Sequence, residues 1–90
     1  MKISIITINH NNASGLEKTM QSVFAQTYNK FEYIVIDGNS FDNSEQIIRN
    51  FENLVPSIQL KWISEPDNGI YNAMNKGVEM STGDFLLFFE

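Results

Sequence analysis

The feature that most constrains the fold is a strict alternation of strand-like and helix-like segments along the 90 residues. Runs rich in β-branched and aromatic residues, which favour strands, lie at 3–8, 31–37, 58–64 and 85–89. Between these runs, apolar residues recur at helical spacing, as they do from Leu16 to Phe24. Parallel strands need a long crossover connection, usually a helix, so this alternation predicts an α/β fold with a mostly parallel sheet.

The helix boundaries can also be predicted from local patterns. Residues 14–17 (SGLE) fit a capping box for a first helix, which we expect to end near Thr27. A second helix follows the polar loop at 38–44, and Asp67 or Asn68 is expected to cap the third helix.

Four strands joined by right-handed crossovers predict the order 3-2-1-4, with helices on both faces of a three-layer, Rossmann-like domain. A chain of this length supports one modest core, so residues 1–90 are expected to form a single domain. Ligands of such sheets bind beyond the carboxyl ends of the strands. The site is therefore expected where the polar exits at 7–11, 37–40 and 65–67 converge.

These exits are rich in carboxylate and amide side chains, which suit a ligand that carries many hydroxyl and ring N–H donors. Each such donor needs an acceptor once water is displaced, and nucleosides and sugars carry several. A formal charge of −5 argues against a surface that binds nucleic acid. The chain has no cysteine, and its apolar runs are too short to span a bilayer, so we expect a soluble protein.

Other nucleotide-binding and hydrolytic classes lack their motifs here. No G-x-G-x-x-G follows the first strand, and no P-loop or G-x-S-x-G motif is present. His10 is the single histidine, so no compact zinc-binding set is available without cysteine.

Four segments together resemble the successive motifs of family 2 glycosyltransferases. They are TINHN at 7–11, IDGNSFDNS at 36–44, SEPDNGIYNAMNKG at 64–77 and STGDFLLFF at 81–89. The resemblance covers almost the whole chain, in order and with suitable spacing. It implies a GT-A fold, of which this chain is the N-terminal part that binds the nucleotide-sugar donor.

The resemblance also implies roles for individual residues. Thr7, His10 and Asn11 would meet the base and ribose, and Asp37 would accept a hydrogen bond from the base. The remaining candidates continue these loops toward the donor; they are Asn39, Ser40 and Asp67, with Asn72 and Asn75 nearby. From chemistry alone a structural role is an alternative for each, since Asp-Gly forms turns and Asp67 can cap a helix.

In the family, an acidic motif after the fourth strand holds a divalent cation, Mg or Mn, against the donor diphosphate. We expect this chain to stop at or before that motif, so that it contains no metal ligand or catalytic residue and is inactive alone. The full-length enzyme would transfer a sugar from a nucleotide-diphosphate sugar to a hydroxyl of an acceptor saccharide or lipid-linked saccharide. Its expected location is the cytoplasm, with the inner face of the membrane as one place where it could act.

An alternative hypothesis is that the chain is a non-catalytic module that binds nucleotides or self-associates. The run at 85–89 (FLLFF) is apolar on both faces. Such a strand at a sheet edge exposes backbone groups and phenylalanine rings. We therefore expect chains to self-associate through this terminal strand.

Overall fold

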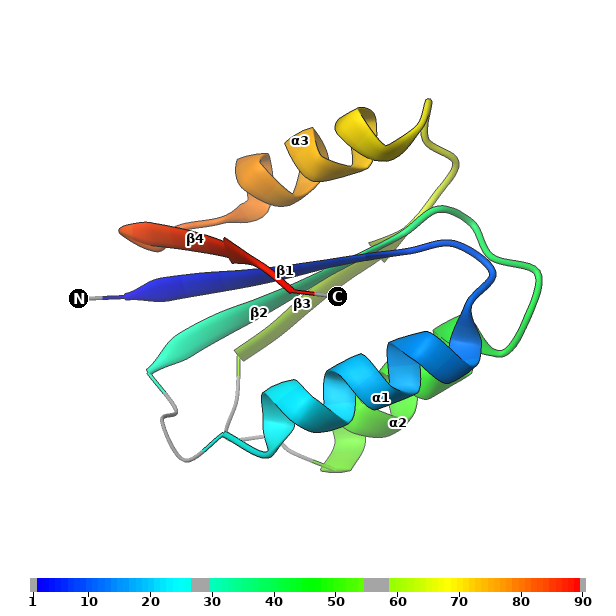
Figure 1. The fold of residues 1–90 in the computed structure, drawn as a ribbon, viewed down its shortest axis with the longest axis horizontal. Coiled ribbons are helices and arrows are strands. Elements are labelled where there is room, and N and C mark those ends of the chain that lie inside the picture. The colour runs from blue at the N-terminus through cyan, green and yellow to red at the C-terminus, as the bar shows by residue number, and fades with distance from the viewer. Residues whose placement is uncertain (1, 27–29, 55–58, 90) are drawn as a thin grey trace.

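A computed structural model of the chain describes residues 2–26, 30–54 and 59–89. Strands and helices alternate along the described chain (Figure 1). In order, the elements are β1 (Ile3–Asn9), α1 (Ala13–Phe24), β2 (Phe31–Asp37), α2 (Ser44–Leu54), β3 (Gln59–Ser64), α3 (Ile70–Met80) and β4 (Phe85–Phe88). The predicted α/β alternation is confirmed.

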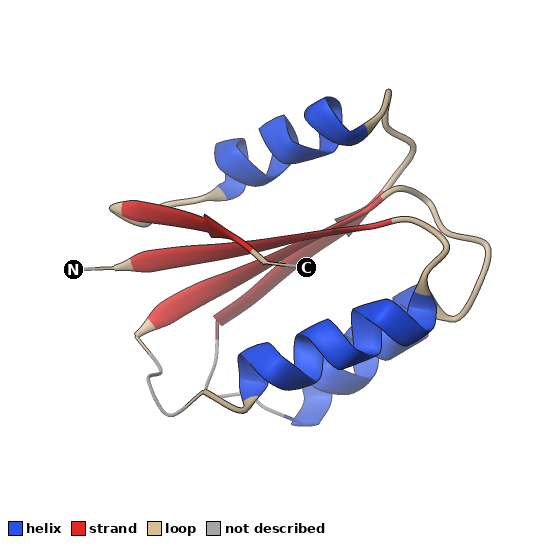
Figure 2. Cartoon of the chain, viewed as in Figure 1, coloured by secondary structure: helices blue, strands red, loops and turns tan. Residues whose placement is uncertain are grey.

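The strands form one parallel sheet in the order β3-β2-β1-β4, as the sequence predicts. Helix α3 covers one face, and α1 and α2 lie together on the other (Figure 2). In this register Asn9 lies beside Asp37, which in turn lies beside Ser64. The last residues of β1, β2 and β3 are therefore neighbours, and the loops that follow them start from one edge of the sheet.

Each face of the sheet has its own apolar core. Leu16, Met20 and Ile48 pack from α1 and α2 against Tyr33 and Val35. On the opposite face, a smaller cluster joins Ala73 of α3 to three isoleucines of the strands, Ile6, Ile34 and Ile36. Helix α3 approaches this face closely, because a Cβ added at Gly77 would lie 2.6 Å from the Ile6 side chain.

Two predicted helix starts are wrong in detail. Helix α1 begins at Ala13, where the Asn12 carboxamide caps it by accepting from the Gly15 amide at 3.3 Å, so residues 14–17 lie inside the helix. At the cap position of α3 the chain has Gly69, with φ of 111°, rather than Asp67 or Asn68. Glycine adopts this conformation without the steric cost that other residues incur.

The end of α1 also differs from the prediction. The helix ends at Phe24, before the expected end near Thr27, which lies outside the described residues. The third strand begins at Gln59, and residue 58 of its expected range is likewise outside them. No helix among the described residues is long and apolar enough to cross a membrane.

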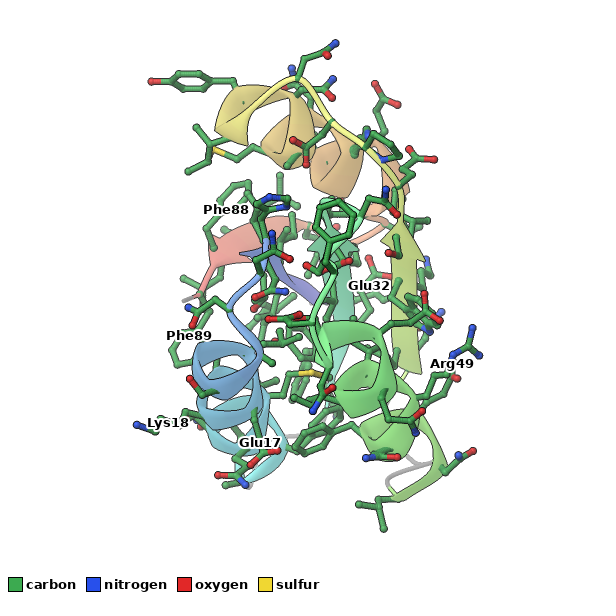
Figure 3. The ribbon with its side chains drawn as sticks, turned by 90° about the vertical axis from the view of Figure 1, so that its right-hand side faces the viewer. Glu17, Lys18, Glu32, Arg49, Phe88 and Phe89 are labelled. Atoms are coloured by element: carbon green, nitrogen blue, oxygen red, sulfur yellow. The ribbon has the colours of Figure 1, made fainter. Side chains whose placement is uncertain are left out.

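The carboxylate of Glu32, whose side chain lies inside the molecule (Figure 3), joins the strands at the opposite, amino end of the sheet. Glu32 of β2 is fully buried, and its Oε2 accepts hydrogen bonds from the hydroxyl of Ser4 and from the amide and hydroxyl of Thr82. Its Oε1 lies 2.8 Å from Lys61 Nζ and 3.8 Å from Lys2 Nζ. One side chain thus joins β1, β2 and β3 to the turn that precedes β4.

Candidate functional site

The candidate site is the rim formed by three loops, residues 10–12, 38–43 and 65–69, which follow β1, β2 and β3. Backbone hydrogen bonds connect the first residues of two of these loops to the ends of the neighbouring strands. The Gly38 amide donates to the Asn9 carbonyl at 2.9 Å, and the Glu65 amide donates to the Asp37 carbonyl at 3.0 Å. The predicted convergence of the three exits is therefore present.

Asp37, at the end of β2, connects the residues at the base of the rim through hydrogen bonds to its carboxylate. Its carboxylate is fully buried. Oδ1 accepts from the Asn9 carboxamide at 2.9 Å and the Ser40 hydroxyl at 2.7 Å. Oδ2 accepts from the Ser40 amide at 3.0 Å and the Ser64 hydroxyl at 2.8 Å. The side chain thus connects the ends of all three strands.

Two opposing effects act on the pKa of Asp37. Burial by itself raises this pKa, because it disfavours the charged form. The hydrogen bonds from Ser40, Asn9 and Ser64 favour the charged form and together outweigh burial, so the pKa is lowered. Asp37 is therefore an ionised carboxylate at neutral pH that orders the loops around it.

Side chains of the first two loops lock them to each other. The Asn11 amide donates to the Ser40 hydroxyl at 2.8 Å, and the Phe41 amide donates to the Asn11 carboxamide oxygen at 2.7 Å. Asn11 and Asn39 have positive φ values of 48° and 60°, a region that asparagine tolerates better than most residues. This part of the rim is therefore fixed by cross-links between the loops.

Asp42 connects the starts of two helices. Its carboxylate accepts from the amide of Ala13, the first residue of α1, and from the amide of Ser44, the first residue of α2, each at 3.0 Å. The Ser44 hydroxyl also donates to it, and these bonds lower the pKa of Asp42. An acidic side chain thus already occupies the positive ends of both helices.

His10 presents a ring of defined tautomer. Its Nδ1 lies 2.9 Å from the Gly38 carbonyl, which can only accept, so Nδ1 carries the proton. Its Nε2 lies 3.2 Å from the Asn11 carboxamide nitrogen and accepts from it. The side chain is exposed, and both ring nitrogens are oriented by the rim.

Asp67 reaches the same corner from the third loop. Its Oδ1 accepts from the Gly69 amide at 3.1 Å. A Cβ added at Gly38 would lie 2.9 Å from Asp67 Oδ2 and 3.1 Å from His10 Nδ1. These two atoms therefore lie at most about 6 Å apart across a residue without a side chain. Asp67 Oδ2 receives no hydrogen bond from any described residue, so it is an acceptor available to a ligand.

Thr7 differs from the other candidates because it lies inside the sheet. It is buried, and its hydroxyl donates to the Phe89 carbonyl at 2.7 Å. The Tyr33 hydroxyl, also at 2.7 Å, is then its donor. Burial raises the pKa of Tyr33 to about 12 against the opposing effect of this bond. Thr7 thus connects β1 to the residue after β4.

The two asparagines of α3 have different surroundings. The Asn72 carboxamide oxygen accepts from the Asn68 amide at 3.1 Å and so stabilises the loop before the helix. Asn75 is exposed and makes no side-chain hydrogen bond among residues 2–26, 30–54 and 59–89. Lys76 supports the same loop, since its Nζ donates to the Pro66 carbonyl at 2.9 Å and pairs with Glu65 at 3.1 Å.

The structure therefore brings His10, Asn11, Ser40 and Asp67 together around Gly38, above the buried Asp37. Sequence reasoning missed Asn9, Ser64 and Gly38. Asn9 and Ser64 are the last residues of the two strands that flank β2, and each pairs in register with Asp37. The predicted strand order therefore contained the signal that would have placed them beside Asp37. The Asp-Gly pair at Gly38 is typical of a turn, and no sequence pattern indicates that the side chains of His10 and Asp67 converge on this glycine.

The corner around Gly38 is suited to binding rather than to bond breaking by itself. It offers carboxylate and carboxamide oxygens at fixed positions, which accept hydrogen bonds from hydroxyl and ring N–H groups. In the part of the chain that the structure describes, no three His, Asp or Glu side chains lie close enough to hold a metal ion.

Comparisons with known proteins agree with this architecture. Residues 4–90 match the model of glycosyl transferase family 2. An uncharacterized glycosyltransferase of Mycobacterium tuberculosis is 42% identical over 87 residues, a match that covers 96% of this chain and 32% of that protein. The chain spans about a third of the length of the curated relatives it matches.

Two solved structures share the fold. One is the mannosyltransferase PcManGT of Pyrobaculum calidifontis in complex with GDP-Man and Mn²⁺, with a TM-score of 0.87 and 24% identity over 93% of this chain and 25% of that one. The other is TarS of S. aureus in complex with UDP-GlcNAc, with a TM-score of 0.83 and 26% identity over 98% and 26%. The predicted GT-A, Rossmann-like architecture is thus confirmed, and the chain belongs to glycosyltransferase family 2.

Proposed function

We propose that this chain holds the nucleotide of a nucleotide-sugar donor on the rim above Asp37. The observation that carries the proposal is the convergence of Asp67 Oδ2 and the His10 ring at Gly38, since a Cβ added there would lie 2.9 Å from Asp67 Oδ2 and 3.1 Å from His10 Nδ1. A nucleoside presents ring N–H and ribose hydroxyl donors, and Asp67 Oδ2 is placed to accept from one of them. The TarS complex with UDP-GlcNAc supports this choice of ligand.

The roles of the rim residues follow from their contacts. His10, Asn11, Ser40 and Asp67 line the ligand side, with Asn39 on the same loop. Asp37 and Thr7 are buried, and we propose that they act through the loops they order. Asn72 and Asn75 lie on α3 toward the rest of the donor.

In the full-length protein we propose transfer of the sugar to an acceptor. An acceptor hydroxyl attacks the anomeric carbon of the donor sugar, and the nucleoside diphosphate leaves with the electron pair of the broken bond. A saccharide or lipid-linked saccharide is the proposed acceptor, and the cytoplasm, at or away from the inner face of the membrane, is the proposed location. PcManGT, which shares the fold, is in complex with Mn²⁺, and we propose that a divalent cation takes part in the reaction here as well.

Calorimetric titration of the chain with UDP and with GDP, each with and without manganese, tests nucleotide binding. We expect one of the two nucleotides to bind at a single site. Circular dichroism and a cooperative thermal transition provide the control for folding. A folded chain that binds neither nucleotide under any of these conditions would contradict the proposed function.

Gly38→Ala is expected to weaken nucleotide binding by at least about tenfold, since displacing one hydrogen bond to a charged group costs about 1.5–3 kcal/mol. The added Cβ would lie within about 3 Å of Asp67 Oδ2 and His10 Nδ1 and push them from the corner. Both are the ends of flexible side chains, so the melting temperature should change little. An unchanged dissociation constant would show that the ligand does not use this corner.

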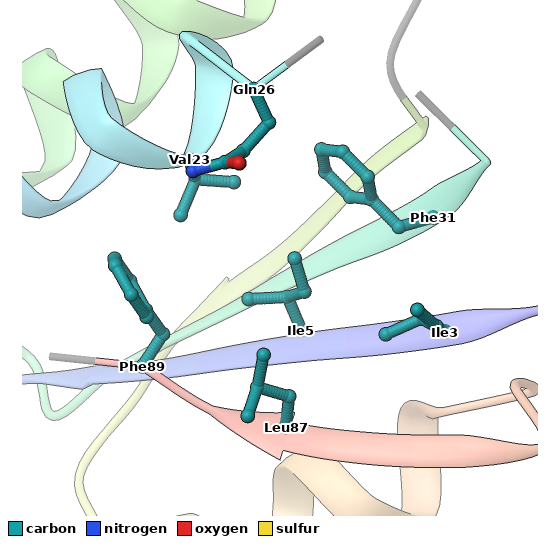
Figure 4. A pocket seen from close by; sticks show the side chains of 7 residues that line it. All are labelled: Ile3, Ile5, Val23, Gln26, Phe31, Leu87 and Phe89. Carbon is teal, nitrogen blue, oxygen red and sulfur yellow. The ribbon is translucent and has the colours of Figure 1, made fainter. Parts of the chain in front are cut away.

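A second proposal, self-association, is favoured by the exposed strand β4. Its residues Phe85–Phe88 are 39–57% exposed, and β4 is at the edge of the sheet order. Next to it, an apolar hollow of about 190 Å³ opens between β4 and α1 (Figure 4). Leu87 and Phe89 line one side of the hollow, and Val23 and Phe31 line the other.

We expect light scattering to show dimers or larger species that increase with concentration. Leu87→Lys should shift the population to monomers, because a charge cannot enter an apolar contact without a large desolvation cost. Lys18→Ala, at an exposed position on α1, is the control and should leave the distribution unchanged. A monomeric wild-type chain at high concentration would contradict self-association.

A further inference from the structure

Phe41 stands out among the exposed apolar side chains. It is 89% exposed, the largest fraction among the exposed large hydrophobic residues of the described chain. Most of the others lie on β4 or α3, whereas Phe41 lies in the loop between β2 and α2, at the rim of the candidate site. Its ring contributes nothing to either core cluster.

The backbone that carries this ring is held on both sides. The residue before it, Ser40, donates its amide to Asp37, and the residue after it, Asp42, is bonded to the starts of α1 and α2. The Phe41 amide itself donates to the Asn11 carboxamide at 2.7 Å. An exposed aromatic ring on a fixed loop is ready to bind a ligand without the cost of ordering that loop.

The same carboxamide connects Phe41 to His10. Asn11 accepts from the Phe41 amide through its oxygen and donates to His10 Nε2 through its nitrogen. His10 in turn donates to the Gly38 carbonyl, beside the Asp67 carboxylate. A single side chain therefore sets the positions of the exposed phenylalanine and of the ring that borders the polar corner.

We propose that Phe41 is the residue against which the base of the nucleotide stacks, an inference that rests on the proposed function. A planar heteroaromatic base can lie on the phenyl face while its N–H groups reach the acceptors of the corner. Stacking of this kind contributes to the affinity for any base, so Phe41 sets the preference for a ligand with an aromatic base over one without. Asp67 and the loop carboxamides act on the edge of the base.

Three substitutions at Phe41 separate stacking from simple apolar contact. Phe41→Ala should weaken UDP and GDP binding by about tenfold to a hundredfold, the range that loss of a stacking partner gives. Phe41→Leu keeps apolar volume without a π face and should recover only a small part of this loss. Phe41→Trp should bind at least as well as the wild type. Because Phe41 is exposed, all three should melt within a few degrees of the wild type.

Fluorescence adds a readout that a purely structural role would not produce. The indole of Phe41→Trp should be quenched when UDP or GDP is added, whereas Trp62, on β3 beside Arg49 of α2, provides the background signal in the wild type. Inorganic pyrophosphate, which has no base, serves as the control ligand. Its affinity should be the same for the wild type and all three variants.

The outcomes distinguish this proposal from the one on which it rests. If the wild type binds a nucleotide and Phe41→Ala binds it equally well, the stacking role is overturned and the site remains. If Phe41→Ala loses pyrophosphate and nucleotide affinity to the same extent, the ring does not act on the base and the role is again overturned. A folded wild-type chain that binds no nucleotide overturns both proposals.

Discussion

Asp37→Ala is expected to lower the free energy of unfolding by about 3 kcal/mol or more, because it leaves several buried donors without an acceptor. The wild-type carboxylate accepts four hydrogen bonds, from Asn9, Ser64 and, twice, Ser40. For a chain of 90 residues, this loss corresponds to a fall in melting temperature of more than about 10 °C. Thermal denaturation followed by circular dichroism measures it.

Asp37→Asn is the matched control. Its carboxamide has nearly the same shape and keeps one acceptor oxygen, but its amino group faces donors, so an intermediate loss is expected. The lowered pKa adds a prediction for pH. A group with a depressed folded-state pKa contributes stability above its ordinary pKa of 3.8 and loses it as the pH falls below that value. A melting temperature of Asp37→Ala within a few degrees of the wild type would contradict this role.

Glu32→Gln is the second substitution with a large expected effect, a loss of about 2–3 kcal/mol in the free energy of unfolding, since it leaves a buried ion pair without its anion. Lys61 Nζ, at 2.8 Å, would keep its charge beside a neutral carboxamide. The Thr82 amide and the Ser4 hydroxyl would also lose a charged acceptor. Urea denaturation of the two proteins measures the difference.

The effect of Glu32 should depend on pH in a defined direction. Burial raises the pKa of Glu32, and the hydrogen bonds from Lys61, Ser4 and Thr82 outweigh it, lowering the pKa from 4.5 to about 2. The stability that Glu32 contributes is therefore complete above pH 4.5 and is lost as the pH falls from there toward 2. The stability difference between the wild type and Glu32→Gln should shrink across the same interval.

Glu45→Gln provides the control for this charge removal. Glu45 pairs with Arg49 one turn along α2 at 3.3 Å, but both side chains are about half exposed, and Arg49 extends outward from the helix (Figure 3). Exposed pairs of this kind contribute about 0.3–0.5 kcal/mol. If Glu32→Gln and Glu45→Gln had equally small effects, Glu32 would not fasten the amino end of the sheet.

The strand order and layers were readable from the sequence because they depend on long, regular patterns. Apolar periodicity places Leu16 and Met20 on one face of α1, and alternation with strands forces a parallel sheet. Helix caps were less predictable, since several polar residues compete for each start. Asn12 rather than Ser14 caps α1, and a glycine with positive φ begins α3.

The candidate site was predicted as a location more accurately than as a set of contacts. His10, Asn11, Ser40 and Asp67 lie on the rim as expected. For Asp37, the sequence indicates an acid at a strand end but not its burial, which depends on donors from β1 and β3 that only the sheet register brings to it. The sequence does not indicate that an apolar residue such as Phe41 is exposed, so its exposure at the rim was known only from the structure.

The measurement that tests the central claim most directly is a ¹H–¹⁵N NMR titration of the chain with UDP and with GDP. If the rim holds the nucleotide, the largest shifts should cluster at the amides of residues 10–12, 38–42 and 67–69. The amides of residues 82–85, at the opposite end of the sheet, should stay unchanged. Shifts centred on the amino end of the sheet or on the hollow beside β4 would contradict a nucleotide site above Asp37. A folded chain whose amide signals do not shift at all would contradict it as well.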